Sequence, residues 1–306
     1  MPRADITREL VACLLEEQFP HWAGLPIEPV DHDGWDNTTF RLGVDKSVRL
    51  PSAEIYSAQV DKEHRWLPVL APQLPLAVPK PLARGVPGCG FPRPWSVYHW
   101  LPGAPASVDR VDDLGEFART LADFLTALYR VDAGGGPAAG VHNFWRGGPL
   151  ETYDRQTRRS VTAIAGDVDE AAALELWEAA LRSSWERPAV WVHGDLSASN
   201  LLVADGRLTA VIDFGTAGVG DPACDLAIAW TFFTGGERAV FRERIALDAD
   251  TWARGRGWTL WKAAITYDET LRTDPGAARE AGIRFGWRQA ARDVLADVIA
   301  DHRLYG

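Results

Sequence analysis

The hydrophobic pattern of this chain changes near residue 103, and this change limits the folds that the chain can adopt. Before that point, β-forming stretches predict strands at 27–30, 39–42, 47–50 and 95–100. Helical patterns cover 4–17 and the segment from Ser57 to Leu67, where Pro68 terminates or interrupts the helix. Seven prolines within residues 72–94 indicate a mostly extended connection. The N-terminal part is therefore predicted to hold a small antiparallel sheet.

Beyond residue 103 the apolar residues recur mainly at the spacing of an α-helix. The patterns predict helices at 112–130, 167–181, 222–233, 250–267 and 277–300. Strands are expected at 189–192, 201–203 and 208–212, with Asp205-Gly206 turning the last two into a hairpin. The predicted fold class is α+β, with a β-rich N-terminal part and a larger, mainly helical C-terminal part that holds one hairpin.

Charge and composition exclude several classes of function. The 32 Lys and Arg residues against 42 Asp and Glu residues give a net charge of −10, which disfavours nucleic acid and suits a cationic small molecule. No apolar run is long enough to cross a membrane, and the N-terminus lacks the apolar centre of a signal peptide. We therefore expect no membrane partner and a cytoplasmic location, while the oligomeric state stays open.

The chain has three cysteines, Cys13, Cys89 and Cys224. An odd, scattered set suits neither a disulfide framework nor a zinc site. All three are expected to be reduced, with Cys13 and Cys224 packed as small apolar groups.

Polar residues flank both ends of the predicted hairpin. Asp195 and Asn200 lie on the loop that enters it and Asp213 lies at its exit, so the hairpin is expected to bring them to one end. Asn and Asp oxygens are hard ligands that suit Mg²⁺, and a separate carboxylate can face an acceptor hydroxyl. A single Asp before Phe-Gly is usually a turn residue, but the combined order and spacing predict a Mg²⁺-dependent group-transfer site.

The block VWVHGDLSASNLLVADGRLTAVIDFGTAGVGDPACDLAIAW, residues 190–230, resembles the aminoglycoside phosphotransferase family, the small-molecule branch of the protein-kinase-like fold. The order of the predicted parts extends this resemblance over nearly the whole chain. It implies a two-lobe fold with a nucleotide-binding lobe at 1–97, a hinge at 98–103, and a helical lobe at 104–306 that carries the catalytic loop and the substrate site. It also implies ATP- and Mg²⁺-dependent phosphorylation of a hydroxyl.

The same resemblance assigns roles around the hairpin. Asp195 corresponds to the catalytic aspartate, Asn200 and Asp213 to Mg²⁺ ligands, and His193 and Asp225 to residues that support the loop. Because a loose phosphoryl-transfer transition state demands little proton removal until late, Asp195 is expected to orient the hydroxyl more than to deprotonate it. His193 is expected to be a packed loop residue and not a base.

In a kinase-like N-terminal lobe, a cation on the third strand meets the phosphates and pairs with a glutamate of the following helix. Arg49 stands where protein kinases have lysine, Glu63 is its expected partner, and Ser47 lies on the same strand face beneath adenine. Arginine can grip phosphate through two N–H groups, although with a different geometry. The alternative is that Arg49 is an ordinary surface arginine.

The phosphate-covering loop and the hinge complete the expected nucleotide site. Residues 34–40 contain one glycine instead of a glycine series, so backbone N–H groups with Asn37 and Thr38 are expected near the phosphates. A simple polar hairpin turn is the alternative. By analogy with a kinase hinge, Tyr98 lies at the back of the adenine pocket, and the backbones of His99 and Leu101 face the edge of the base.

The acceptor is expected to be small, because ten positions between Gly215 and Asp225 leave no room for a long peptide-docking segment. The segment 142–159 is a candidate wall of the acceptor site. Asp268 and Glu269 are candidate partners of a cationic acceptor, with a solvated helix end as the alternative. The favoured activity is phosphorylation of an aminoglycoside or a related antibiotic, in a resistance role. A metabolic kinase acting on choline, a sugar or a macrolide, and a kinase-like binding protein without turnover, are the alternatives.

Overall fold

The computed structural model describes residues 2–30, 34–283 and 286–306, and the chain divides into two compact units. The first unit combines the chain up to Pro102 with the short segment Val211–Gly215. The second comprises Gly103–Ala210 and Thr216–Gly306. Asp213, which was placed with the C-terminal lobe, thus packs within the first unit.

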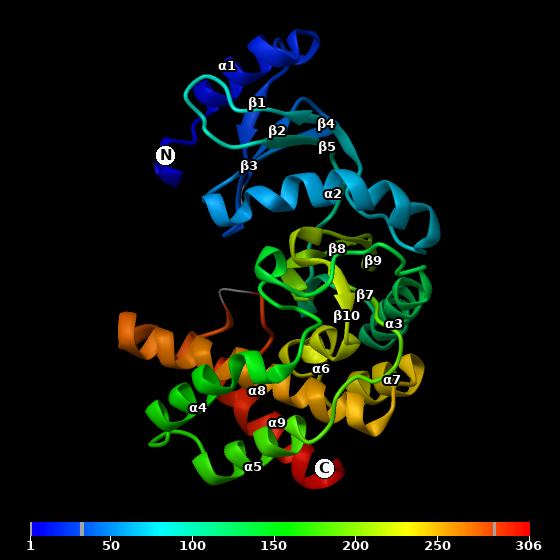
Figure 1. Cartoon of the computed structure of the whole chain (residues 1–306), viewed down its shortest axis with the longest axis vertical. Coiled ribbons are helices and arrows are strands. Elements are labelled where there is room, and N and C mark those ends of the chain that lie inside the picture. The colour runs from blue at the N-terminus through cyan, green and yellow to red at the C-terminus, as the bar shows by residue number, and fades with distance from the viewer. Residues whose placement is uncertain (1, 31–33, 284–285) are drawn as a thin grey trace. The chain divides into compact units, whose positions relative to one another are not determined.

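The first unit is built on a five-stranded antiparallel sheet in the order β1-β2-β3-β5-β4 (Figure 1). Its strands are β1 Ile27–Pro29, β2 Asn37–Leu42, β3 Lys46–Pro51, β4 Pro81–Gly85 and β5 Trp95–His99. The strand β4 lies in the proline-rich stretch that was predicted as a connection. It is an edge strand and begins with proline, a position where the missing N–H costs no ladder hydrogen bond.

One helix covers each face of this sheet (Figure 1). The helix α1, Arg8–Gln18, buries Leu14 and Leu15 against strand residues that include Val48 and Val97. The helix α2, Ser57–Leu70, lies on the face that carries the alternate strand residues. It continues through Pro68 and ends two residues later, at Leu70.

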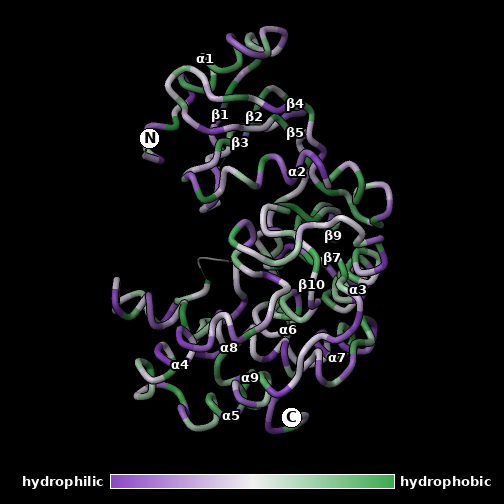
Figure 2. Tube along the Cα trace, viewed as in Figure 1, coloured by the Kyte–Doolittle hydropathy of each residue, from purple (hydrophilic) through white to green (hydrophobic). Residues whose placement is uncertain are grey.

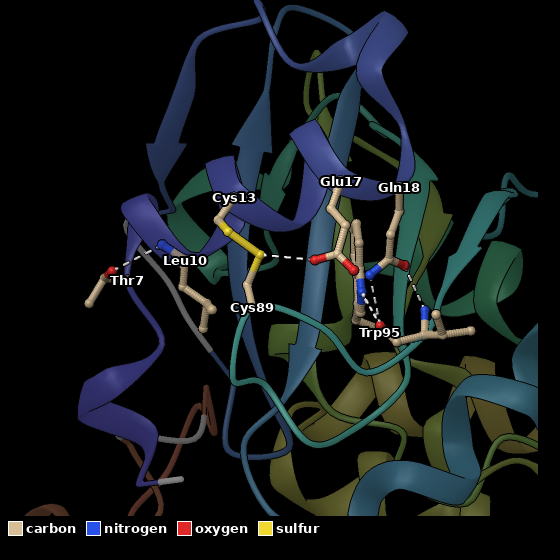
Figure 3. Close-up of a disulfide and its surroundings, with 8 residues drawn as sticks. Thr7, Leu10, Cys13, Glu17, Gln18, Cys89 and Trp95 are labelled. Carbon is tan, nitrogen blue, oxygen red and sulfur yellow. Dashed lines mark hydrogen bonds between the residues drawn. A yellow bond between two sulfur atoms is a disulfide. The ribbon is translucent and has the colours of Figure 1, made fainter.

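The cysteine prediction was wrong for two of the three residues. Cys13 on α1 and Cys89 in the loop between β4 and β5 form a disulfide, with their Cα atoms 6.2 Å apart (Figure 3). The two positions are 76 residues apart in sequence, so no local pattern pairs them. Gln18 also ties α1 to this loop, through hydrogen bonds with both the N–H and the carbonyl oxygen of Val86. Cys224 is buried and free.

The second unit is mainly helical. Its helices are α3 Leu114–Arg130, α4 Asp154–Ala163, α5 Glu170–Leu181, α6 Ile228–Thr231, α7 Gly235–Ile245, α8 Ala249–Thr273 and α9 Ala291–Tyr305. Two small sheets accompany them, formed by β6 Ala104–Pro105, β8 Leu201–Ala204 and β9 Arg207–Val211, and by β7 Val190–Val192 and β10 Gly218–Gly220. The long helix α8 packs against α4, α5 and α9 and thereby forms the centre of this unit.

Several helices of the structure differ from the predicted ones. The segment 222–233 is a 3₁₀ turn, Pro222–Ala227, followed by the short α6, and the C-terminal helix begins at Ala291 instead of near 277. Residues 284–285, inside that predicted helix, lie outside the described residues. The helices α4 and α7 were not predicted. Figure 2 shows hydrophilic residues interrupting the hydrophobic ones along the trace, and no helix of the described chain is long and apolar enough to cross a membrane.

Candidate active site

The loop that follows β7 presents His193, Gly194 and Asp195 in the second unit. The strand β7 pairs antiparallel with β10, which anchors the start of the loop. The buried carboxylate of Asp225 accepts hydrogen bonds from the backbone N–H groups of His193 and Gly194, at 3.0 and 2.7 Å. Burial raises the pKa of Asp225, and the two N–H donors and the nearby His193 oppose that rise. Asp225 therefore fixes the loop through its backbone.

Glycine is required at position 194 for two reasons. Its φ of +83° lies in the left-handed region, which side chains with a Cβ rarely adopt. A Cβ would also lie 2.7 Å from the carbonyl oxygen of Thr216 and 2.8 Å from the Cβ of Arg146. His193 is fully buried, and its carbonyl oxygen accepts a hydrogen bond from Thr216 Oγ1. The side chain of His193 is thus a packed part of the loop.

The carboxylate of Asp195 forms an ion pair with Lys262 on α8, with Oδ1 and Nζ 2.8 Å apart. Burial opposes ionisation of Asp195, but the positive charges of Lys262 and Arg146 outweigh burial and lower the pKa of Asp195 to about 2. Asp195 is consequently a carboxylate at any physiological pH.

Asn200 lies at the end of the same loop and is nearly buried. Its Nδ2 donates a hydrogen bond to the carbonyl oxygen of Asp195 at 2.9 Å, which fixes the orientation of the amide. In the described parts of the chain, Asn200 Oδ1 accepts no hydrogen bond, so an oxygen ligand of the kind that Mg²⁺ prefers is left for another partner.

A pocket opens beside Asp195 in the second unit. Its lining combines three residues of the loop, a pair of cations, two large aromatic rings and two small side chains. These residues are Arg146, Gly194, Asp195, Leu196, Cys224, Ala227, Trp258, Trp261 and Lys262. Asp268 and Glu269 are not among these residues. Asp268 is buried on α8, where it accepts hydrogen bonds from Ser160 Oγ and from Arg272, and Glu269 is exposed.

In the first unit, a largely buried arginine, Arg49, bridges two carboxylates. Arg49 Nη1 lies 3.5 Å from Glu63 Oε1, and Arg49 Nη2 lies 3.0 Å from Asp213 Oδ1. Burial opposes the charge of Arg49, but Glu63 and Asp213 outweigh burial and raise the pKa of its guanidinium. Tyr98 donates a hydrogen bond to Glu63 Oε2, and its ring lies 5.6 Å from the Arg49 guanidinium. Tyr98 therefore holds Glu63 in place for Arg49.

Asp213 has a strained backbone, because its φ of +66° is uncommon for a residue with a side chain. Its Oδ1 contacts Arg49, while no group in the described residues donates a hydrogen bond to Oδ2. A free carboxylate oxygen, like the free amide oxygen of Asn200, has the chemistry of a Mg²⁺ ligand. Asn200 and Asp213 thus each carry a side-chain oxygen of the kind that Mg²⁺ prefers.

The segment 34–40, which was predicted to cover the phosphates, is held in place by hydrogen bonds to its carbonyl groups. Arg3 donates hydrogen bonds to the carbonyl oxygens of Gly34, Trp35 and Asn37. Ser52 donates from its N–H to the carbonyl oxygen of Asp36, and its hydroxyl donates to that of Trp35. Asn37 is buried at the start of β2, and the hydroxyl oxygen of Thr38 is buried without a hydrogen-bond partner in the described residues. Residues 31–33, just before this segment, lie outside the description.

The strand and hinge residues of the expected nucleotide site lie in the same unit. Ser47 is buried on the sheet face of Arg49, opposite Tyr98 in register. The backbone N–H of His99 donates to Lys80, whereas Leu101 N–H makes no hydrogen bond among the residues that the structure covers. Leu101 thus has a donor available for a bound molecule.

Sequence reasoning missed Lys262, Trp258 and Trp261, whereas Arg146 lies in the segment 142–159 that was expected to line the acceptor site. Lys262 and Arg146 lie 67 and 49 positions from Asp195, and no motif joins them to the loop. The scarcity of lysine was a weak signal, since Lys262 is one of four lysines among the 32 basic residues.

Comparisons with known proteins identify the family of this chain. The model of the phosphotransferase enzyme family matches residues 27–258. The uncharacterized protein YcbJ of Bacillus subtilis (strain 168) is 27% identical over 196 residues, which are 63% of this chain and 59% of that protein. An aminoglycoside 3'-phosphotransferase of Escherichia coli is 38% identical over 81 residues, 24% of this chain and 30% of that enzyme. The matches thus span less than two thirds of either relative.

Solved structures show the same fold. The GDP complex of aminoglycoside 2'-phosphotransferase IIIa aligns with a TM-score of 0.69 at 17% identity, covering 97% of this chain and 99% of that one. The macrolide 2'-phosphotransferase MphH of Brachybacterium faecium aligns with a TM-score of 0.54 at 26% identity, covering 85% and 91%. These matches confirm the predicted kinase-like fold class, and the family match extends over most of the chain. The chain belongs to the phosphotransferase enzyme family.

Proposed function

We propose that this chain is an ATP-dependent phosphotransferase that transfers the γ-phosphate to a hydroxyl group of a small molecule. The observation that carries the proposal is the ionised carboxylate of Asp195, held on a rigid loop at the edge of a pocket. The names of the similar structures support it, because they describe nucleotide complexes and enzymes that phosphorylate antibiotics.

The low pKa of Asp195 bears on its role. A carboxylate with a pKa of about 2 is a weak base, so it accepts a hydrogen bond from the acceptor hydroxyl more readily than it removes the proton. In a loose transition state the hydroxyl becomes acidic only as the new bond to phosphorus forms. Asp195 therefore orients the oxygen for attack and takes its proton late.

In this proposal the first unit binds the nucleotide. Arg49 contributes a fixed positive charge for the phosphates, and Leu101 offers its backbone N–H to the base. Asn200 and Asp213 would hold Mg²⁺, which neutralises phosphate charge when it is bound. The side chains of Glu63 and Tyr98 keep Arg49 in position before the nucleotide arrives.

The experiment that tests this proposal measures ADP release from Mg·ATP with a panel of hydroxyl acceptors. Asp195→Ala should leave nucleotide affinity nearly unchanged and lower turnover by roughly 100-fold, because it removes a group that acts on the reacting hydroxyl. Asp213→Ala should instead abolish Mg²⁺-dependent ATP binding, as measured by calorimetry. Turnover that survives Asp195→Ala would contradict the proposed role, and a chain that fails to bind nucleotide would favour a kinase-like binding protein.

A further inference from the structure

The pocket beside Asp195 has more positive than negative charge. Among its lining residues, Asp195 is the carboxylate, and Arg146 and Lys262 are the cations. Lys262 forms the ion pair with Asp195, so its charge is matched. Arg146 adds a positive charge that this pair does not neutralise.

Arg146 is surrounded by aromatic rings instead of carboxylates. Its guanidinium carbon lies 4.5 Å from the ring centroid of Trp261, 5.6 Å from that of Trp258 and 5.9 Å from that of Tyr153. Its Nη1 donates a hydrogen bond to the Tyr153 hydroxyl at 3.2 Å. Within the described ranges, no carboxylate lies within 4.0 Å of the Arg146 guanidinium. Aromatic faces attract a guanidinium but do not cancel its charge.

The rings also limit how Arg146 can move. Tyr153 and Trp261 lie with their centroids 4.1 Å apart, and Trp258 packs against both. Trp261 is oriented in turn by a hydrogen bond from its Nε1 to Gln156. Within the described residues, the guanidinium of Arg146 uses Nη1 in its one side-chain hydrogen bond, which leaves the other N–H donors for a planar anion. The arrangement is therefore a preformed site for one negative group.

Aminoglycosides carry several ammonium groups, and this pocket offers them little. The acidic residues expected to receive them are elsewhere, since Asp268 is engaged by Ser160 and Arg272 and Glu269 does not line the pocket. An ammonium group that entered beside Asp195 would face Lys262 and Arg146 and would be repelled. The chain as a whole has a net charge of −10, but the residues that line this pocket have more positive than negative charge.

We propose that the acceptor is a hydroxylated carboxylate, whose carboxylate binds Arg146 while its hydroxyl lies at Asp195, and that aminoglycosides are poor acceptors. This inference rests on the proposed function and names the substrate class of the same pocket. The reaction is unchanged: the hydroxyl oxygen forms a bond to the γ-phosphorus as the bond from that phosphorus to the β,γ-bridging oxygen breaks. ADP leaves with the electron pair, and the hydroxyl proton passes to Asp195.

Matched acceptors test this charge preference directly. We would measure kcat/KM by ADP release from Mg·ATP with glucuronate against glucose, gluconate against sorbitol, glycerate against glycerol, and with kanamycin, using Asp195→Asn as the blank. At least one carboxylate should exceed its neutral partner by roughly 10- to 100-fold, the value of a charge-assisted hydrogen bond, and kanamycin should fall below the neutral compounds.

Variants separate recognition by Arg146 from a structural role. Arg146→Gln should reduce the carboxylate preference to within about threefold, with the neutral acceptor as internal control, because a folding defect would lower both activities alike. Arg146→Lys should retain part of the preference. Arg244→Gln, which removes an exposed arginine on α7 that pairs with Asp123, should change nothing.

The possible results distinguish the two proposals. Kanamycin as the best acceptor, or a carboxylate preference that survives Arg146→Gln, would overturn this inference and leave the phosphotransferase function intact. Asp195-dependent turnover of neutral and anionic partners at equal rates would overturn it too. No Asp195-dependent ADP release with any acceptor would refute the proposed function itself, and with it this inference.

Discussion

The partly buried ion pairs of Arg49 yield a quantitative prediction about the first unit. The side chains of Arg49, Glu63 and Asp213 are 15%, 5% and 28% exposed, so Glu63 depends most on its partner for compensation of its charge. At 3.5 Å and an effective dielectric constant of 20, the attraction between Arg49 and Glu63 is about 5 kcal/mol before the cost of desolvation. Replacing Arg49 with an uncharged residue removes this attraction and leaves a buried carboxylate.

Arg49→Met should therefore lower the free energy of unfolding by about 3–5 kcal/mol, which is the cost of removing one partner of an ion pair and leaving the charge of the other partner uncompensated. Glu63→Gln keeps an acceptor for the Tyr98 hydroxyl and should cost only about 1–2 kcal/mol. In the double variant no unpaired charge remains at position 63, so its cost should be smaller than the sum of the single costs by about 1–3 kcal/mol.

The assay is urea unfolding followed by circular dichroism, with ATP affinity measured by calorimetry on the same proteins. Arg84→Met is the matched control, because Arg84 on β4 pairs with Asp61 on α2 in an exposed ion pair, which should contribute less than about 1 kcal/mol. Additive costs for Arg49→Met and Glu63→Gln would refute the coupling. So would an Arg84→Met cost as large as that of Arg49→Met.

Other single changes should have effects of known direction. Gly194→Ala places a Cβ 2.7 Å from the carbonyl oxygen of Thr216 at a φ of +83°, so turnover measured by ADP release should fall by about tenfold or more, and full activity would contradict the loop geometry. Cys13→Ser removes a disulfide between positions 76 residues apart, so the free energy of unfolding, measured in urea without reductant, should fall by up to about 4 kcal/mol. A variant as stable as the oxidised wild type would contradict this prediction. Burial lowers the pKa of Lys62 to about 8, against the attraction of nearby carboxylates, so the folded chain loses this proton before the unfolded chain does. Its contribution to stability should therefore rise between pH 8 and 10.5, and a pH-independent difference between the wild type and Lys62→Met would refute this.

Local patterns predicted much of the fold and one side of the candidate site. The alternation of residues 47–50 places Ser47 and Arg49 on one face of β3, because successive side chains of a strand point to opposite faces. The stripe of apolar residues in α3 likewise follows the helical repeat. Asp195 and Asn200, five positions apart, lie on one loop that is bounded by short strands, as their spacing indicates. Such features depend only on neighbours in sequence.

Contacts between distant segments were decided by packing alone. Lys262 reaches Asp195 because α8 packs beside the turn at Pro222–Ala227. Arg146 lies at the pocket because it contacts the ring of Tyr153, just before α4, and the ring of Trp261 on α8. The same packing turned Asp268 inward to Ser160. The periodicity of α8 shows which positions are buried but not which neighbours they meet. The residues that we propose for the transfer reaction were therefore visible in the sequence, whereas the charge that we propose selects the acceptor was set by tertiary structure.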